Sequence, residues 1–181
     1  VAAALAIVVG VPLGILTSRS DRLERVVRVV LDFAQVLPIF VYFSPAQIFL
    51  GIQMPPAVAV TFIYALPPAV RLTNLGLRQV PVVMNEVGES FGSTKRQQLL
   101  KVQLPIARRT ILLGLNQVIM MAFGIVVIAA LLGTTDTGSL VLKALQKNDV
   151  GAAFIPGLAL VFTAMALDRM TTGERPRSIK A

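Results

Sequence analysis

Long stretches without a charged residue dominate this sequence. Counted from one charge to the next, they cover residues 1–18, 33–70, 110–135 and 150–167. A helix of about 20 apolar residues crosses the hydrocarbon core of a bilayer. Only 14% of all residues are charged, against about a quarter in a soluble domain. The pattern therefore predicts an integral membrane protein and argues against a soluble enzyme.

The run 33–70 is too long for a single span, and Gly51 and the paired prolines at 55–56 near its middle are turn signals. Dividing it there predicts an all-α, polytopic membrane helix bundle of about five spans, near 1–17, 31–51, 55–71, 110–132 and 150–167. The prolines inside spans two and three are expected to kink or locally unwind these helices, where neighbouring groups satisfy the freed carbonyls. They are Pro38, Pro45, Pro67 and Pro68.

Residues 1–170 are predicted to form one transmembrane domain, followed by a polar tail over 171–181. The first apolar run has neither a starting Met nor a basic flank, so we interpret it as the start of an N-terminally truncated chain and not as a signal peptide. The sequence has no cysteine, which excludes disulfides and thiolate metal sites.

The basic residues predict an orientation in the membrane. Of the 17 lysines and arginines, all but Lys143 and Lys147 follow span one, lie between spans three and four, or follow span five. Cytoplasmic segments of membrane proteins are enriched in positive charge. We therefore expect a multi-pass protein of the plasma (inner) membrane with the 73–109 loop and the C-terminus in the cytoplasm. This placement accounts for the net charge of +8 without nucleic-acid binding.

The cytoplasmic loop is itself patterned as two helices. Pro81 suits the first turn of a helix that Gly92 ends. Thr94 and Gln97 have the spacing of a capping box, which opens a second helix. Pro105 is expected to end or bend that second helix, because proline removes a helical hydrogen bond.

The same loop carries a spaced motif: Glu86-Val87-Gly88, then Gly92 after three residues, then Val102 and Leu104-Pro105 after nine more. It resembles the E-A-A…G…I-x-L-P signature of the transmembrane subunits of bacterial ATP-binding cassette importers, with Val87 and Gly88 where alanines are usual. The resemblance implies a coupling helix that docks in a cleft of a separate cytoplasmic ATPase. The ATPase-coupling candidates are Glu86, Glu89, Ser90, Phe91, Gly92, Lys95 and Arg96. Taken singly, the two glutamates are more simply explained as solvated surface charges.

Further stretches resemble the glycine betaine/proline permeases, among them Pro12-Leu13-Gly14-Ile15, residues 37–42, residues 65–73 and Gly114-Leu115-Asn116-Gln117. The resemblance implies a permease for a small osmoprotectant of the glycine betaine, proline betaine, choline or carnitine type. Residues 134–138 depart from the Gly-rich stretch usual in that branch.

Four amides inside or near the spans are candidates for lining a passage, because an unpaired amide in lipid is costly. They are Gln35, Gln47, Asn116 and Gln117. Hydrogen bonding between helices is the alternative role for these side chains. The chain has no Trp and two Tyr, so it is poor in the aromatic groups that cage a quaternary ammonium. Selective capture is therefore assigned to an extracytoplasmic substrate-binding protein.

The other expected partners are the cytoplasmic ATP-binding cassette ATPase, a second permease copy or paralogue, and membrane lipid. No cofactor and no metal are expected in this chain; ATP and Mg are expected on the partner ATPase. Three alternatives remain open: a permease for another small solute in the same superfamily, a secondary transporter or channel without an ATPase, and a membrane anchor. A secondary transporter would normally place an ionisable coupling residue at mid-membrane. An enzyme is least favoured, since His and Cys are absent and no Walker-type loop is present.

Overall fold

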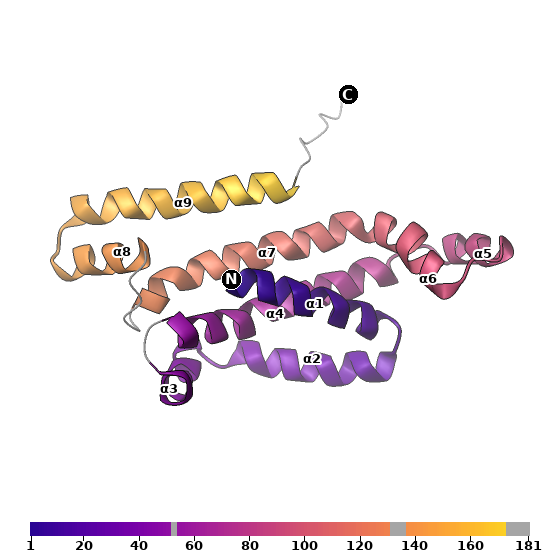
Figure 1. Cartoon of the computed structure of the whole chain (residues 1–181), viewed down its shortest axis with the longest axis horizontal. Helices are drawn as coiled ribbons and strands as arrows, with labels where there is room; N and C mark the ends of the chain where they lie inside the picture. Colours follow the sequence, from indigo (N-terminus) through magenta and orange to yellow (C-terminus); the bar gives the residue numbers. More distant parts are fainter. Residues whose placement is uncertain (52–53, 131–136, 173–181) are drawn as a thin grey trace, which may run out of the picture.

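The computed structural model describes residues 1–51, 54–130 and 137–172, and every regular element in them is helical (Figure 1). The elements in chain order are α1 (Ala2–Ser18), α2 (Asp21–Val36), α3 (Ile39–Leu50), α4 (Met54–Arg78), α5 (Val82–Ser90), α6 (Lys95–Gln98), the π-helical turn η1 (Leu99–Gln103), α7 (Leu104–Ala130), α8 (Thr137–Gln146) and α9 (Val150–Thr172). The all-α prediction is confirmed.

Helix α4 lies at the centre, with α1 and α7 packed against it. Small residues permit the close approach. A Cβ atom on Gly10 would lie 2.5 Å from the Cβ of Ala69, and one on Gly114 would lie 2.9 Å from the Cβ of Leu72. Lipid gives no hydrophobic drive for helices to associate, so close packing of this kind contributes to helix association in membranes, together with interhelical hydrogen bonds and lipid entropy. The sequence places glycine where the three central helices touch.

The second predicted span is two helices rather than one. Helices α2 and α3 meet at an angle of 94° across Leu37 and Pro38. Proline supplies no backbone N–H, and the residue before it is driven to extended backbone, which is where Leu37 lies with φ −70° and ψ 132°. The break expected at Pro38 is therefore present, but the boundary of 31–51 is wrong, because α2 already begins at Asp21.

Three helical stretches are long and apolar enough to cross a membrane: Met54–Arg78, Lys95–Ala130 and Val150–Thr171. The bent α2–α3 pair makes up to four, and α1 is a shorter apolar helix of 17 residues. The predicted set of five apolar segments thus corresponds to these helices. Pro45 lies inside α3, and Pro67 and Pro68 lie inside α4, without ending either helix. The predicted tail (171–181) and the end of the fourth span (131–132) fall mostly outside the described residues.

Helix α8 was not predicted from the sequence; it packs against α7 and α9. Its end is set by Asn148, which has a positive φ of 53°. The Asn148 N–H donates to Leu145 at 3.1 Å and the Asp149 N–H donates to Ala144 at 3.0 Å. Asp149 then caps α9, since its carboxylate accepts from the Ala152 N–H at 2.9 Å. Most of the departing stretch 134–138 lies outside the described residues.

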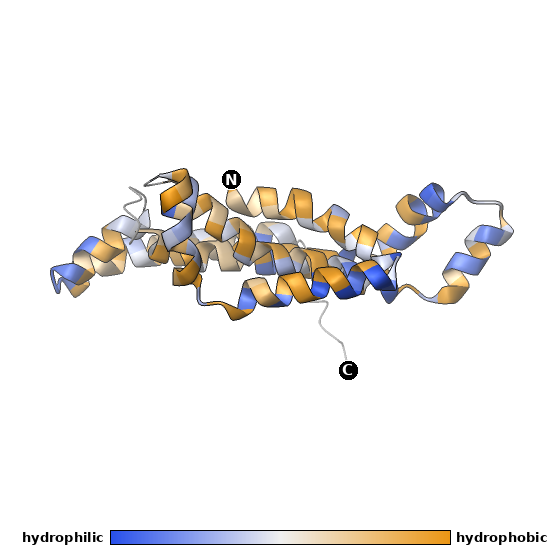
Figure 2. Cartoon of the chain, turned by 90° about the horizontal axis from the view of Figure 1, so that it is seen from below, coloured by the Kyte–Doolittle hydropathy of each residue, from blue (hydrophilic) through white to orange (hydrophobic). Residues whose placement is uncertain are grey.

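The predicted 73–109 loop is largely helix. Helix α4 continues to Arg78, and the helical stretch that leads into α7 begins at Lys95. The connection between them contains α5 and the turn around Gly92. Figure 2 shows α5, α6 and their connection extending beyond the bundle at one end. We call residues 81–98 the projection. The α8–α9 turn lies at the opposite end (Figure 1).

Candidate functional site

The projection is turned by a glycine elbow. Gly92 follows α5 with φ +70°, a conformation that side chains with a Cβ rarely adopt. Its N–H donates to Glu89 at 2.8 Å, and the N–H of Ser93 donates to Gly88 at 3.0 Å. These two bonds form a Schellman motif, which satisfies carbonyls at the end of α5. The prediction that Gly92 ends this helix is confirmed.

The second helix of the projection starts as the sequence indicates. The Thr94 hydroxyl accepts from the Gln97 N–H at 3.3 Å, and the Gln97 side chain accepts from the Thr94 N–H at 2.9 Å. Pro105, however, does not end the helix. The π-helical turn η1 precedes it, and the N–H of Leu104 bonds to Leu99, five residues back. The wider turn accommodates the proline, so α6, η1 and α7 form one continuous helical stretch.

The seven coupling candidates all lie on the projection, at one end of the molecule (Figure 2). All seven residues are exposed. Phe91 stands out because its surface is 87% exposed. Val83 and Val87 on α5 are also exposed. Glu86, Glu89, Lys95 and Arg96 form no ion pair within the described part of the chain. An apolar anchor surrounded by unpaired charges is suited to docking against another protein.

Sequence reasoning missed three amides that tie the projection together. The Gln98 side chain donates to the Asn85 backbone carbonyl at 2.8 Å, and the Gln103 side chain donates to the Asn85 side-chain oxygen at 3.1 Å. Asn85 lies next to Glu86 of the motif, but single-sequence spacing gives no sign that Gln98 and Gln103 would return to it.

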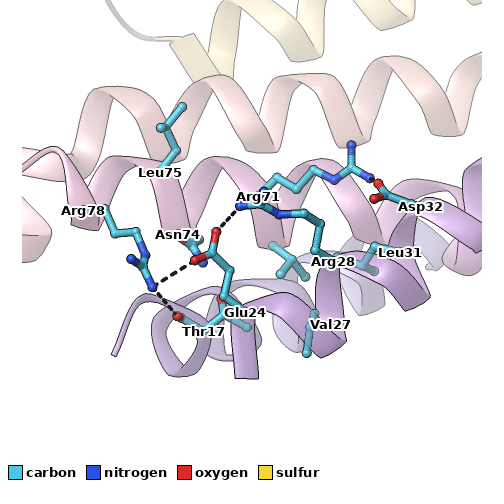
Figure 3. Close-up of a pocket in the computed structure, with 11 residues that line it drawn as sticks. Thr17, Glu24, Val27, Arg28, Leu31, Asp32, Arg71, Asn74, Leu75 and Arg78 are labelled. Carbon is cyan, nitrogen blue, oxygen red and sulfur yellow. Dashed lines mark hydrogen bonds and ion pairs between the residues drawn. The ribbon is translucent and has the colours of Figure 1, made fainter. Parts of the chain in front are cut away.

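A second polar feature was also missed: a cavity of about 410 Å³ between α1, α2 and α4 (Figure 3). Arg78 of α4 donates to Asp21 at 2.6 Å and to Glu24 at 3.0 Å. Arg71, two turns earlier on α4, pairs with Asp32. Local spacing gives no sign of these pairs, because the partners lie on different helices and are far apart in the sequence. In the sequence, these residues resemble charges of the loops between spans.

A model of one protein family matches residues 6–172, and it is described as the binding-protein-dependent transport system inner membrane component. That match covers nearly the whole helical bundle together with the projection. The chain belongs to this family.

Relatives of this inner membrane component come from several bacteria. The chain is 48% identical over 167 residues to the glycine betaine/carnitine transport permease protein GbuB of Listeria monocytogenes, covering 92% of this chain and 59% of that protein. It is 46% identical over 165 residues to the glycine betaine/proline betaine transport system permease protein ProW of Escherichia coli, covering 91% and 47%. The chain therefore spans about half to three fifths of the length of these relatives.

The fold of the inner membrane component is also found in solved structures of ABC transporters. A structure of the inward-facing MetNI methionine ABC transporter superposes with a TM-score of 0.76 at 19% identity, covering 96% of this chain and 90% of that one. A structure of an amino acid ABC transporter gives a TM-score of 0.71 at 18% identity, covering 94% and 86%. At these identities the likeness concerns the fold.

In the described part of this inner membrane component, the four passage candidates lie on three different helices. Gln35 lies on α2 and Gln47 on α3, both partly exposed, whereas Gln117 on α7 is exposed. Asn116 is buried, and its side-chain oxygen has no hydrogen-bond partner among the described residues. None of the four lines the charged cavity or the second, more apolar cavity of about 340 Å³ between α1, α4 and α7.

Proposed function

We propose that this chain is the permease subunit of an ATP-driven importer and forms the passage for a small osmoprotectant of the glycine betaine, proline betaine, choline or carnitine type. The observation that carries the proposal is the identity of 46–48% to glycine betaine permeases over more than nine tenths of this chain. Permeases of a related methylated amine, trimethylamine N-oxide, are less similar at 37–38%. The substrate is therefore a compact, methylated, zwitterionic or cationic solute.

The proposed energy source is a separate cytoplasmic ATP-binding cassette ATPase that binds ATP and Mg. The exposed ring of Phe91 and the unpaired charges of Glu86, Glu89, Lys95 and Arg96 support docking of the projection in a cleft of that subunit. Selective capture is assigned to an extracytoplasmic substrate-binding protein. The family description, which calls the transport system binding-protein-dependent, supports this assignment. A second permease copy or paralogue completes the enclosure of the passage.

The proposed orientation places the projection and the C-terminal end of α9 in the cytoplasm, and the α8–α9 turn outside. Support comes from the distribution of basic residues, and from the opposite positions of the projection and the α8–α9 turn in the bundle. Because the sequence has no cysteine, Lys95→Cys and Leu145→Cys each introduce a single exposed thiol. An impermeant thiol reagent should label intact cells at 145 and label 95 only after permeabilisation. The reverse pattern would invert the orientation.

Substitutions at the elbow test ATPase coupling. A Cβ atom on Gly92 would have open space around it, so the cost of replacing this glycine is backbone strain alone. Gly92→Val should cost about 1–2 kcal/mol in the elbow and Gly92→Pro should also remove the N–H that bonds to Glu89. Both should insert normally, associate weakly with the ATPase and lose ATP-dependent uptake, and Glu86→Ala should show a milder loss. Gly92→Asn is the matched control, because asparagine tolerates positive φ.

Phe91→Ala gives an independent test, since an 87% exposed ring contributes little to the fold of the chain itself. We expect unchanged thermal stability and loss of copurification with the ATPase. If Phe91→Ala and Gly92→Pro both retained wild-type ATPase association and uptake, the chain would not be coupled through the projection. A channel or secondary transporter would then be the better interpretation.

The substrate is tested by uptake of labelled glycine betaine, proline betaine, choline, carnitine and trimethylamine N-oxide in cells that carry the complete system. Glycine betaine is expected to be taken up and to compete with the other methylated amines. Transport of an unrelated small solute, with no uptake of these five, would assign the chain to another branch of the same superfamily.

A further inference from the structure

Helix α5 of the projection has no buried residue, although it carries most of the candidate docking surface. A helix of nine residues is too short to be stable alone in water, and burial of apolar side chains is the usual source of its stability in a protein. Something other than a hydrophobic core must therefore fix the orientation of α5. The elbow at Gly92 fixes one of its ends but leaves the rest of the helix to be held by polar contacts.

Those contacts converge on Asn85. The backbone carbonyl of Asn85 accepts from the Gln98 side chain at 2.8 Å, and the Asn85 side-chain oxygen accepts from the Gln103 side chain at 3.1 Å. Gln98 is only 6% exposed, and Asn85 and Gln103 are partly buried. The two glutamines lie at the end of α6 and at the end of η1, so Asn85 is held on both sides of the π-helical turn.

The continuous helical stretch of α6, η1 and α7, which we call the rod, receives these bonds. Residues Lys95–Ala130 form one helical stretch of 36 residues, equivalent to about 50 Å at 1.5 Å per residue. At its base, Leu77 and Val80 near the end of α4 pack with Ala107 of α7 and partly buried neighbours that include Leu99 of η1. A displacement of α5 that is transmitted through Gln98 and Gln103 therefore acts directly on α7.

We propose that Asn85 is a positioning residue for coupling: its two hydrogen bonds lock α5 to the α6–η1–α7 rod, so that movement of the docked ATPase displaces the rod and is not absorbed by rotation at the Gly92 elbow. The inference rests on the proposed function. Asn85 need not touch the ATPase, and its role is separate from that of Phe91. Without these bonds, the backbone of the elbow would remain the main link between α5 and the rod.

The experiment uses the complete importer, with its ATPase and substrate-binding protein, reconstituted in liposomes. It compares wild type with Asn85→Ala and Gln103→Leu. Each variant removes the bond between the two side chains and leaves the bond from Gln98 to the Asn85 backbone carbonyl in place. ATPase association, ATP hydrolysis and solute uptake are measured in the same preparation. Both variants should assemble and hydrolyse ATP as wild type does. Solute imported per ATP should fall about fivefold, the factor that corresponds to one lost hydrogen bond of about 1 kcal/mol.

Two further variants separate coupling from a general structural effect. Gln97→Ala removes an amide from the same region whose side chain bonds to Thr94 and not to Asn85, so its transport ratio should remain at the wild-type value. Gln103→Glu, unlike Gln103→Leu, should keep the wild-type ratio of solute imported per ATP, because the Asn85 amide can reorient and donate to the new carboxylate.

An unchanged transport ratio in both Asn85→Ala and Gln103→Leu would overturn the inference. Loss of ATPase association in both would overturn it too, because the amides would then shape the docking surface and not the transmission of movement. Failure of the proposed function has a different signature: the wild-type chain itself would neither retain the ATPase nor import solute with ATP.

Discussion

The hydroxyl of Tyr42 donates a hydrogen bond of 3.2 Å to the carbonyl of Ala34, the acceptor that Pro38 leaves without a helical donor. Tyr64 of α4 acts in the same region, since its hydroxyl donates to the carbonyl of Leu37. The two rings meet edge to face with centroids 5.8 Å apart. The bend between α2 and α3 is therefore held by tyrosine hydroxyls that replace missing backbone donors.

Removal of the Tyr42 hydroxyl should destabilise this bend. Tyr42→Phe leaves the Ala34 carbonyl unsatisfied and should lower the free energy of unfolding by about 1–2 kcal/mol, and Tyr64→Phe should act similarly. Thermal unfolding of the purified chain in detergent measures the effect. Phe49→Leu, which changes an exposed ring on the same helix, is the control. Equal stability of all four proteins would show that the hydroxyls do not hold the bend.

The contact between α1 and α4 predicts a second effect. A Cβ on Gly14 would lie 2.5 Å from the Cβ of Thr73 and 2.8 Å from the carbonyl of Val70. Gly14→Val should therefore force the helices apart and lower stability by about 1–3 kcal/mol, the usual cost of overpacking. Gly124→Val on α7 is matched in chemistry but has open space at its Cβ. The melting temperature should fall for the first and not for the second; a comparable fall in both would attribute the effect to valine in a helix.

The elbow and the capping box could be predicted because they depend on local backbone chemistry. Gly92 and the Thr94–Gln97 pair determine their hydrogen bonds within a few residues, and the structure reproduces those bonds. The break at Pro38 was predictable for the same reason. The length of α2 was not, because Arg22, Arg25 and Arg28 resemble loop charges until their helix is seen to lie beside α4.

The polar contacts between distant segments could not be predicted from one sequence. Asn85 and Gln103 are 18 residues apart, and Arg71 and Asp32 are 39 apart. Nothing in the local spacing of either pair indicates that they meet. Pro105 was expected to end or bend its helix, and the helix does not end there, because the π-helical turn that finishes at Gln103 supplies the needed space.

The ion pairs between α2 and α4 should contribute modestly and unequally. Arg78 is closer to Asp21 than to Glu24, at 2.6 Å against 3.0 Å, but the Asp21 side chain is 82% exposed and that of Glu24 is 20% exposed. Solvent screening weakens the exposed pair more than the extra distance weakens the other. Glu24→Gln should therefore destabilise more than Asp21→Asn.

Arg78→Gln removes its pairs with Asp21 and Glu24, and Glu24→Gln removes the pairs of Glu24 with Arg78 and Arg28. Each lost pair should lower stability by about 0.2–1 kcal/mol. The control is Arg22→Gln, since Arg22 makes no ion pair in the described part of the chain. Thermal unfolding at low and high salt gives the measurement, and the difference between Arg78→Gln and wild type should narrow as salt is raised. A larger effect of Asp21→Asn than of Glu24→Gln would contradict the argument from exposure.

Substitution of Asn116 distinguishes the two roles considered for the four amide candidates, which are lining a passage and hydrogen bonding between helices. Its side chain is 8% exposed, and its oxygen lacks a hydrogen-bond partner among the described residues. If the amide held helices together, Asn116→Leu would lower stability. We expect the opposite, because replacing an unsatisfied buried amide oxygen removes a desolvation penalty of about 1–3 kcal/mol. Thermal stability of Asn116→Leu should therefore be maintained or raised. If Asn116 faces the passage in the assembled importer, uptake should also fall, because the passage would lose a polar group. Asn116→Ser, which keeps a hydroxyl at the same place, should retain more uptake than the leucine variant. A loss of stability in Asn116→Leu with uptake per folded protein unchanged would assign Asn116 to helix packing and remove it from the passage.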